Sequence, residues 1–340
     1  MNKKPLFSIC MPVYNGETYI GDAINSVINQ EFTSWELVIV DDGSTDDTWK
    51  ICKLFSEKDN RIRVFRKNNQ GALAARQYAI QFTKGDYILF IDADDYYEKY
   101  ALRKLYETVE ACEVDIILFG YNEVDGSTIQ TYKNHFQPGY IEKQIILSTV
   151  ISGPKINSMC TKAIRAKLMK GDKTDYSEFY STCFGEDKIQ FFYPLTYATS
   201  FVYIDCGLYN YRINNQSISH KRYSKAIIEK RCQMQVWKLL RSYMTLWSRD
   251  SKDDIEQYAA YCLRNLINIY STSCNIEGGK ELVKSIDWIK YIPEEVFGNK
   301  CSCYFERKNR IKLWCIKHKI TNVFTLNSFV QKVLRKIKRG

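Results

Sequence analysis

The chain has 340 residues, of which 45% are hydrophobic and 26% charged, and its net charge is +10. This length suits one large domain or one large and one small domain, and the composition excludes a predominantly disordered chain. The sequence contains no uncharged apolar stretch of membrane-spanning length, and its start lacks the apolar run of a signal peptide.

The twelve cysteines are spread from Cys10 to Cys315 and form no CxxC pair. Cys301 and Cys303 are too isolated to indicate a zinc site. Free thiols are typical of proteins in a reducing compartment. We therefore expect a cytoplasmic protein.

The first third of the chain alternates predicted strands with predicted helices. Apolar runs predict strands over 6–13, 35–40, 62–66 and 87–91. Helical spacing of apolar residues predicts helices over 16–30 and 71–83, and a further helix follows the acidic stretch at 41–47. This order predicts an α/β fold with a doubly wound, mostly parallel sheet, right-handed crossovers and flanking helices.

The pattern loosens after residue 98. A helix over 98–111 and a strand over 114–121 still fit the sheet, and a helix near 141–151, a helix over 185–198 and a strand over 201–213 follow. Beyond that point the clearest helices cover 225–247, 254–272 and 307–319. We predict a catalytic domain over 1–220 and a helical C-terminal region over 221–340, which we interpret as a region for acceptor binding, oligomerisation or membrane docking.

Three predicted strands end in polar residues. The strand ends read Pro12-Val13-Tyr14-Asn15, Asp41-Asp42-Gly43-Ser44 and Asp92-Ala93-Asp94-Asp95. Ligands of open parallel sheets bind outside the carboxyl ends of the strands. These residues therefore indicate a ligand site at one edge of the sheet.

The acidic cluster at 92–95 suggests a metal ion. Neighbouring carboxylates repel one another unless a cation joins them, and Mg²⁺ or Mn²⁺ is commonly held by one or two carboxylates together with substrate phosphates. This favours a substrate that carries a diphosphate. Solvated aspartates at a strand end, capping the next helix, are the structural alternative, and Asp95 is the residue expected to cap that helix.

Two other classes of nucleotide-binding enzyme lack their motifs here. The turn after the first strand reads PVYNGETY, with one glycine, so the G-x-G-x-x-G turn of dinucleotide enzymes is absent. The phosphate-binding GxxxxGK[ST] motif is absent as well.

The sequence resembles glycosyltransferase family 2, the inverting enzymes of GT-A-type fold. The stretches PVYNGETYI, LVIVDDGSTDDT, NNQGALAARQYAI and GDYILFIDADD resemble the donor half of that family, and GEDKIQFF and LYNYRINNQSIS resemble its later elements. The resemblance covers about the first 220 residues, and the motifs occur in the order and spacing of the family.

The resemblance implies a nucleotide-diphosphate sugar donor, most often a UDP-sugar. Tyr14 would stack on the uracil, a contact of ~1–3 kcal/mol, and Asp41 would accept the uracil N3–H. Asp94 would bind the metal, while Asp92 would contact the ribose or the metal shell. The other residues implied to bind the donor are Pro12, Val13, Asn68, Asn69, Arg76 and Ala93.

The resemblance also implies the groups that carry the chemistry. Asp187 would act as the base that takes the proton of the acceptor hydroxyl, and Glu186 would orient the acceptor or the base. Both acidic residues could instead simply favour the N-terminus of their helix. Arg212 would reach the pyrophosphate or serve as a structural ion-pair partner.

The basic character of the chain is concentrated at its end. Residues 307–340 contain 11 Lys or Arg and no Asp or Glu, one charge more than the net +10 of the whole chain. The segment 328–340 has apolar residues at helical spacing among basic ones, which suits an anionic membrane surface. A solvated helix packed on the body of the protein is the alternative, and no nucleic-acid motif accompanies the charge.

We therefore predict an inverting, metal-dependent glycosyltransferase that uses a UDP-sugar with Mn²⁺ or Mg²⁺. Its acceptor would be a saccharide or a lipid-linked saccharide of surface polysaccharide or glycoconjugate biosynthesis, at the inner face of the plasma membrane. The alternatives are a sugar nucleotidyltransferase and a non-catalytic nucleotide-sugar-binding module. A Glu186-Asp187 pair far from the acidic cluster would favour the binding module.

Overall fold

The computed structural model describes residues 4–153, 156–180, 185–214, 234–275, 278–288 and 307–322. These residues fall into two compact units. The first unit contains residues 4–147, 156–180 and 185–214, and the second contains residues 148–153 and the described residues from 234 onward. The predicted domain boundary near residue 220 lies outside the described residues.

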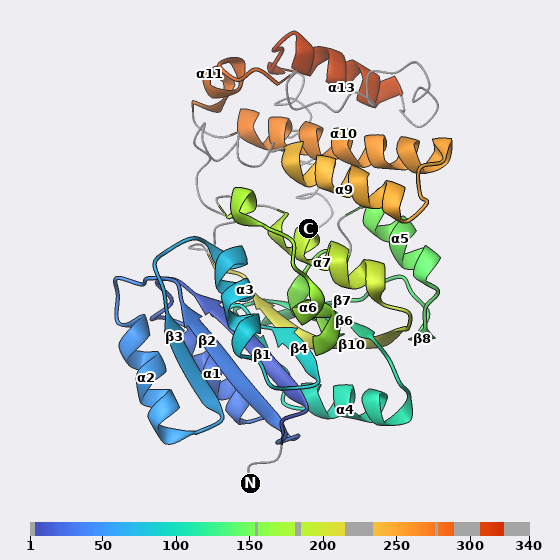
Figure 1. Ribbon diagram of the computed structural model, residues 1–340. Coiled ribbons are helices and arrows are strands. Elements are labelled where there is room, and N and C mark those ends of the chain that lie inside the picture. The colour runs from blue at the N-terminus through green and yellow to red at the C-terminus, as the bar shows by residue number, and fades with distance from the viewer. Residues whose placement is uncertain are drawn as a thin grey trace. The chain divides into compact units, whose positions relative to one another are not determined.

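The first unit is built on a ten-stranded mixed sheet (Figure 1). Its strands are β1 (Phe7–Val13), β2 (Trp35–Asp41), β3 (Ile62–Arg66), β4 (Tyr87–Phe90), β5 (Tyr96–Tyr97), β6 (Ile116–Asp125), β7 (Thr128–Tyr132), β8 (Gly139–Tyr140), β9 (Lys162–Arg165) and β10 (Phe201–Arg212). The order is β3-β2-β1-β4-β9-β6-β10-β5, with β7 paired to β6 and β8 to β10.

The predicted mostly parallel, doubly wound sheet is confirmed. β1 runs parallel to β2 and β4, β2 to β3, and β6 to β10. β9 is inserted between β4 and β6 and is antiparallel to both. The antiparallel insertion was not predicted, because β9 has only four residues and its pairing depends on partners far along the chain.

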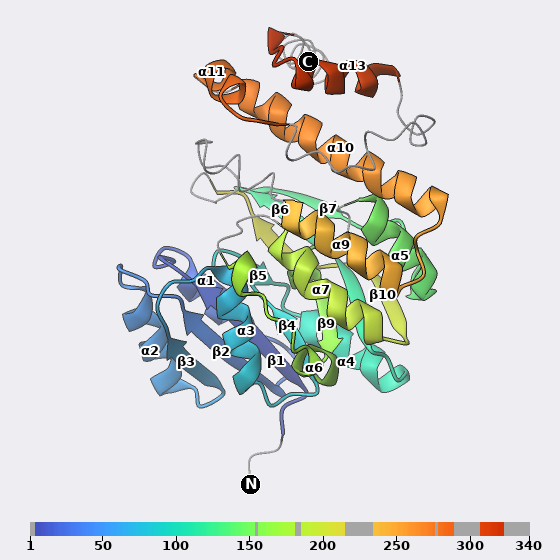
Figure 2. The same ribbon diagram turned by 45° about the horizontal axis from the view of Figure 1, so that its top comes forward.

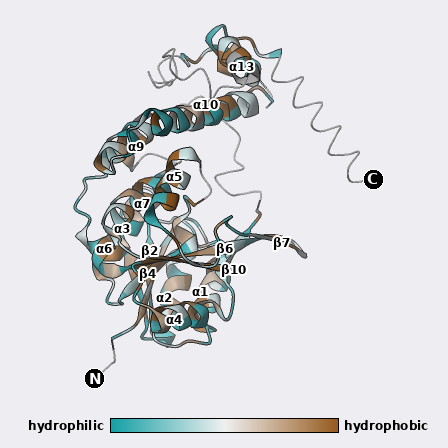
Figure 3. Ribbon diagram, turned by 90° about the vertical axis from the view of Figure 1, so that its right-hand side faces the viewer, coloured by the Kyte–Doolittle hydropathy of each residue, from teal (hydrophilic) through white to brown (hydrophobic). Residues whose placement is uncertain are grey.

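Helices cover both faces of this sheet. They are α1 (Ile20–Ile28), α2 (Thr48–Lys58), α3 (Ala72–Phe82), α4 (Ala101–Ala111), α6 (Ala166–Gly171) and α7 (Glu186–Tyr197), with two 3-10 turns, η1 (Met159–Thr161) and η2 (Ser177–Phe179). Figure 3 views the sheet nearly edge-on, with α1, α2 and α4 on one face and α3, α6 and α7 on the other. Every residue of β1, β2 and β4 is buried, as expected for strands covered on both faces.

Two helices begin later than the apolar spacing predicts. α1 begins at Ile20 rather than 16, and Gly16 N–H donates to Thr48 Oγ1 at 2.8 Å. α4 begins at Ala101 rather than 98, and Glu98 N–H donates to the carbonyl of Leu208 at 3.0 Å. In both places a tertiary hydrogen bond anchors the chain just before the helix.

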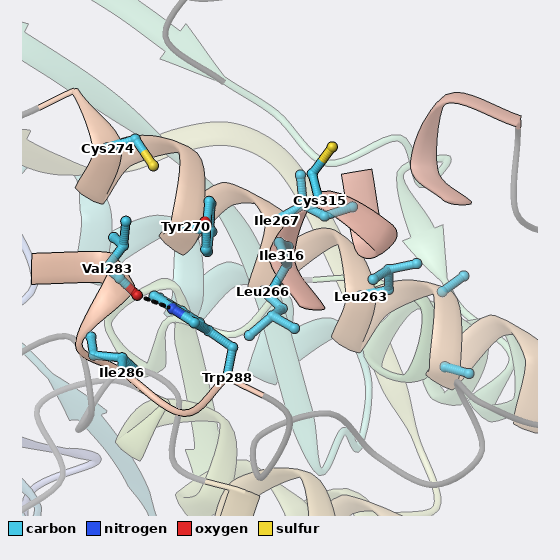
Figure 4. Packing of buried hydrophobic residues seen from close by; sticks show 12 residues of the cluster. Leu263, Leu266, Ile267, Tyr270, Cys274, Val283, Ile286, Trp288, Cys315 and Ile316 are labelled. Atoms are coloured by element: carbon cyan, nitrogen blue, oxygen red, sulfur yellow. Dashed lines mark hydrogen bonds between the residues drawn. The ribbon is translucent and has the colours of Figure 1, made fainter. Parts of the chain in front are cut away.

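The second unit is helical, as predicted. Its helices are α9 (Met234–Leu246), α10 (Lys252–Cys274), α11 (Gly279–Lys284) and α13 (Arg307–Lys317), and α5 (Lys143–Ser152) is divided between the two units. A buried apolar cluster joins α10, α11 and α13 (Figure 4). Within it, the ring centroids of Tyr270 and Trp288 lie 4.9 Å apart in an edge-to-face arrangement. Trp288 Nε1 donates to the carbonyl of Val283 at 2.7 Å.

Across the described segments, no helix is both long and apolar enough to cross a membrane. The predicted tail helix over 328–340 lies outside the described residues, as does the beginning of the helix predicted over 225–247.

Candidate active site

The carboxyl ends of β1, β2 and β4 form one edge of the sheet. The three strands are parallel neighbours (Figure 2), and Val13 is in register with Asp41. The N–H of Ile91, the residue before the acidic cluster, donates to the carbonyl of Cys10 at 3.1 Å. The three polar strand ends therefore lie side by side, as the sequence predicts.

Asn15 joins the loops that follow β1 and β2. Its backbone N–H donates to Ser44 Oγ at 2.9 Å, and its side-chain Oδ1 accepts the backbone N–H of Thr45 at 2.8 Å. Asn15 has a positive φ of 50°, which asparagine tolerates better than most residues. This connection follows the buried pair Pro12 and Val13 and leaves Tyr14 with an exposed fraction of 51%.

Asp41 is completely buried at the end of β2. Its Oδ1 accepts the backbone N–H of Ser44 at 2.9 Å. Its Oδ2 lies 3.1 Å from Nε of Arg66, but no described group makes an aligned hydrogen bond to it. Buried carboxylate oxygens are normally satisfied, so this oxygen retains hydrogen-bonding capacity beside its ion pair with Arg66.

Asp42 organises the loop between β3 and α3. Lys67 Nζ donates to its Oδ1 at 2.7 Å, and the N–H groups of Gln70 and Gly71 donate to the same carboxylate at 3.1 and 2.7 Å. The predicted donor residues Asn68 and Asn69 are exposed within this loop. The sequence places Asp42 at the end of the second strand but predicts no contact for it.

Gly43 brings the second loop against this third loop. It has a φ of 79°, and a Cβ there would lie 3.1 Å from the backbone N of Asn69. A larger residue would therefore be strained and would push the two loops apart. The glycine of the acidic turn thus allows the backbones of the two loops to approach closely at Gly43 and Asn69.

Asp94 and Asp95 are held by the end of β10 and the residues after it. Asn214 Nδ2 donates to Asp94 Oδ2 at 2.9 Å. Tyr209 Oη donates to Asp95 Oδ2 at 2.5 Å, and the N–H of Arg212 donates to its Oδ1 at 2.8 Å. The prediction that Asp95 caps the next helix is wrong, because its carboxylate fastens β10 to the acidic cluster.

Burial and neighbouring negative charges act on the carboxyl groups of the acidic cluster. Burial, and then the charge of Asp92, raise the pKa of Asp94. Burial, and then the charges of Asp92 and Asp94, raise the pKa of Asp95 to about 8. Such a cluster is arranged to gain from a positive ligand.

The donor set of the cluster fits a cation that is shared with a substrate. Within the described part of the chain, no three His, Cys, Asp or Glu side chains are grouped to hold a metal ion. Asp92 and Asp94 supply two carboxylates, and one oxygen of each already accepts from Arg76 or Asn214. Phosphate oxygens would have to complete the shell, as is usual for Mg²⁺.

Arg76 connects the acidic cluster with the first turn of α7. It is almost fully buried in α3, and its Nη2 lies 2.9 Å from Asp92 Oδ1, while its Nη1 pairs with Asp187 Oδ1. Asp187 and Asp92 retain exposed side-chain fractions of 25% and 41%. The acidic pair of α7 and the acidic strand end therefore belong to one site, and Arg76 is not the surface residue that helix periodicity alone allows.

Glu186 begins α7 after Gly185, which adopts a left-handed conformation. Burial, followed by the charge of Asp187, raises the pKa of Glu186 to about 7. Two adjacent, half-buried carboxyl groups thus have different environments: Asp187 is paired with Arg76, whereas the pKa of Glu186 is raised. Such a difference is common where acid–base chemistry occurs.

Arg212 is turned toward α1. Its Nη2 lies 3.1 Å from Asp22 Oδ2, and its guanidinium lies 4.8 Å and 5.4 Å from the ring centroids of Tyr19 and Tyr96. Of the two roles left open by the sequence, this arrangement is that of an ion-pair partner. The backbone of Arg212 nevertheless contacts the acidic cluster through Asp95.

The site contains residues that the sequence reading did not select. They are Asp42, Tyr209, Asn214 and the buried Lys162. Tyr209 and Asn214 lie in the stretch LYNYRINN, which marks them as members of a recurring motif but carries no sign of their partners. Their contacts cross about 120 positions of sequence, for example from Asn214 to Asp94.

Comparisons with known proteins agree with this geometry. Residues 8–176 match the family described as Glycosyl transferase family 2. An uncharacterised glycosyltransferase of Haemophilus influenzae is 30% identical over 232 residues, which cover 66% of this chain and 85% of that protein. Glycosyltransferase GlyA of Streptococcus pneumoniae is 30% identical over 216 residues, which cover 62% of this chain and only 31% of GlyA.

The fold is similar to that of a solved structure. The chain of Staphylococcus aureus TarS, crystallised in complex with UDP-GlcNAc, superposes with a TM-score of 0.68 at 22% identity. The match covers 96% of this chain and 92% of the TarS chain. At this level of identity the likeness concerns the fold.

Proposed function

Because the chain belongs to glycosyl transferase family 2 and is a glycosyltransferase, we propose that it transfers a sugar from a UDP-sugar to an acceptor hydroxyl with inversion at the anomeric carbon. The pathway would be the synthesis of a surface polysaccharide or glycoconjugate. The observation that carries this proposal is the pairing of Arg76 with both Asp92 and Asp187. It brings the donor side and the base side of the reaction within the reach of one side chain.

The uridine would bind at the ends of β1 and β2. Tyr14 offers an exposed ring, and stacking on a base is worth ~1–3 kcal/mol. The Oδ2 of Asp41, which lacks an aligned hydrogen bond, would accept a ring N–H. TarS, which has the same fold, was crystallised with UDP-GlcNAc, and this supports a uridine nucleotide here.

The diphosphate would lie over the acidic cluster, with Pro12, Val13 and Ala93 lining the donor path and Asn68 and Asn69 beside it. Asp94 and Asp92 would hold Mn²⁺ or Mg²⁺, an ion that offsets the charge of a departing diphosphate. Asn214 orients the Asp94 carboxylate, and Arg76 holds one oxygen of Asp92. The remaining oxygens of these two carboxylates would then hold the ion.

Asp187 would take the proton of the acceptor hydroxyl. As the acceptor oxygen forms its bond to the anomeric carbon, the bond to the diphosphate breaks and the proton moves to the Asp187 carboxylate. A single displacement of this kind inverts the configuration. Arg76 orients the Asp187 carboxylate through its ion pair, and half-buried Glu186 would orient the acceptor or the base.

The two alternative functions are less well supported. A Glu186-Asp187 pair far from the acidic cluster would favour a binding module. In the structure, Arg76 pairs with both Asp187 and Asp92, so the two groups lie close together. A sugar nucleotidyltransferase normally has a Gly-rich basic turn after its first strand, whereas this turn holds Tyr14 and Asn15.

We also propose that the C-terminal region docks on an anionic membrane surface, where a lipid-linked acceptor would be found. On α13, Cys315 and Ile316 are buried in the apolar cluster, while Ile311 and Trp314 have exposed fractions of 50% and 55%. Residues 307–322 contain six Lys or Arg and no acidic residue. An exposed tryptophan among basic residues suits the lipid headgroup region.

The donor proposal can be tested by calorimetric titration with UDP, with and without Mn²⁺, on the wild type and Asp94→Ala. We expect the metal to strengthen binding in the wild type and to have no such effect in the variant. Absence of UDP binding under both conditions would refute the uridine donor. Asp187→Asn is expected to bind UDP normally but to lose transfer from UDP-sugars to saccharide acceptors.

A further inference from the structure

Lys162 is a buried cation that the proposed mechanism does not yet use. It begins β9, opposite Leu118 of β6, and its side chain is completely buried. Lysine is rarely fully buried without a partner, because an ammonium loses its hydration there. Within the described part of the chain, no carboxylate lies within 4.0 Å of its ammonium.

Two neutral groups hold the Lys162 ammonium in place. It donates to the backbone carbonyl of Ser158, the residue that caps the η1 turn. It also lies 4.6 Å from the centroid of the Phe191 ring, within the range of a cation–π contact. These contacts fix the position of the charge without neutralising it.

The ring of Phe191 locates this charge relative to Asp187. Both residues are on α7 and are four positions apart, so they share one face of the helix. Burial lowers the pKa of Lys162 to about 7, and the charge of Asp187 is the largest effect in the opposite direction. The carboxylate whose charge most favours the protonated form of Lys162 is therefore that of the proposed base.

We propose that Lys162 is a positioning residue for Asp187: its buried ammonium places a fixed positive charge beside the face of α7 that carries Asp187 and steadies the first turn of that helix. The inference rests on the proposed role of Asp187 as the base. Arg76 pairs with the same carboxylate from α3, so cations from two different elements act on Asp187.

Other charged and titratable groups face the same place. Glu186 precedes Asp187 on α7, Cys160 lies buried on η1, and Asp92 ends β4. The negative charges of Asp187 and Asp92 both act on Glu186 and on Cys160. The coupling must therefore be tested with a variant of Asp187 itself as well as with variants of Lys162.

The first measurement needs no enzymatic activity. Protein labelled with ¹³C at lysine Cε is titrated by NMR, and the Lys162 signal is assigned by its loss in Lys162→Arg. We expect this signal to titrate well below the other lysines and to shift to still lower pH in Asp187→Asn, which removes the favourable negative charge. A Lys162 signal unmoved in Asp187→Asn would overturn the coupling, whether or not the protein proves to use UDP-sugars.

The second measurement is the pH profile of kcat/KM for sugar transfer. Lys162→Met keeps an unbranched apolar side chain and removes the charge, so the acidic limb should move to higher pH by about one unit. Lys162→Arg should keep the wild-type limb, and Lys167→Met, at a lysine with an exposed fraction of 67%, is the matched control. An active Lys162→Met enzyme with an unshifted limb would assign Lys162 a purely structural role.

Discussion

Arg76 on α3 pairs with Asp187 on α7, although 111 positions separate the two residues in the chain. The same guanidinium reaches Asp92 at the end of β4. Arg76 is thus the link between the acidic strand end and the helix that carries the proposed base. Its buried position means that it cannot leave one partner without affecting the other.

Replacing Arg76 should impair both stability and activity. Arg76→Gln removes two charge-assisted contacts, and since both carboxylates keep some exposure to water we expect a loss of about 1–3 kcal/mol in the free energy of unfolding. Sugar transfer should fall at least tenfold, because Asp187 loses its orientation. Urea denaturation and initial rates measure the two effects. The control Arg103→Gln disrupts an exposed pair with Glu31 and should cost less than about 1 kcal/mol.

Tyr14 should contribute to donor binding through its ring and not through its hydroxyl. Tyr14→Ala should weaken UDP binding by about 5- to 150-fold, the equivalent of ~1–3 kcal/mol, whereas Tyr14→Phe should bind like the wild type. Calorimetry measures both constants. Tyr140→Ala, at a tyrosine on β8 with an exposed fraction of 68%, serves as the control. Equal affinities for UDP in the wild type and Tyr14→Ala would mean that the uracil ring does not stack on Tyr14.

Asp42 should stabilise the loop that presents Asn68 and Asn69. Asp42→Ala leaves the N–H groups of Gln70 and Gly71 without their acceptor, at a cost of about 1–3 kcal/mol. Hydrogen exchange at these two amides should accelerate, while exchange in the core of β1 stays slow. Unchanged protection of both amides in the variant would contradict this role.

Glu186 should make the protein less stable as the pH rises. Its pKa is raised from 4.5 to about 7, so between these values the folded state binds more protons than the unfolded state. The stabilisation is fully present below pH 4.5 and is lost as the pH rises through 7, with a slope of at most about 1.4 kcal/mol per pH unit.

Glu186→Gln, which stays neutral, should remove this part of the pH dependence and be more stable than the wild type at pH 8. Denaturation curves from pH 4 to 8 measure the difference between the two proteins. Parallel stability profiles would mean that the pKa of Glu186 is the same in the folded and unfolded states, and would contradict the prediction.

The exposed face of α13 should bind anionic vesicles. Co-sedimentation with vesicles containing phosphatidylglycerol should be strong at low salt, weaker in 0.5 M NaCl and absent with pure phosphatidylcholine. The double substitution Ile311→Gln and Trp314→Gln should reduce binding several-fold, because the apolar anchors are lost.

Ile129→Gln, at an isoleucine of 61% exposed fraction on β7, is the matched control for this surface. If the double variant and the control bind the vesicles equally well, α13 is not the docking surface.

The sequence by itself determined the order of strands and helices over residues 6–91. Short continuous apolar runs that alternate with amphipathic helices, such as the run ending at Ile91, are typical of strands covered on both faces, and the polar residues at their ends then lie at one edge. That reasoning is sufficient to place Tyr14, Asp41 and Asp92 together. It is also sufficient to identify the helical character of the last third.

Only the tertiary structure decided which distant groups meet. The antiparallel insertion of β9, the pairing of Arg76 with Asp187, and the attachment of Asp95 to Tyr209 all join segments far apart in the chain. Local periodicity carries no information about such contacts, because it reports only which face of an element is buried. For the same reason Lys162 could be recognised as a buried cation beside the proposed base only once β9 had been placed between β4 and β6.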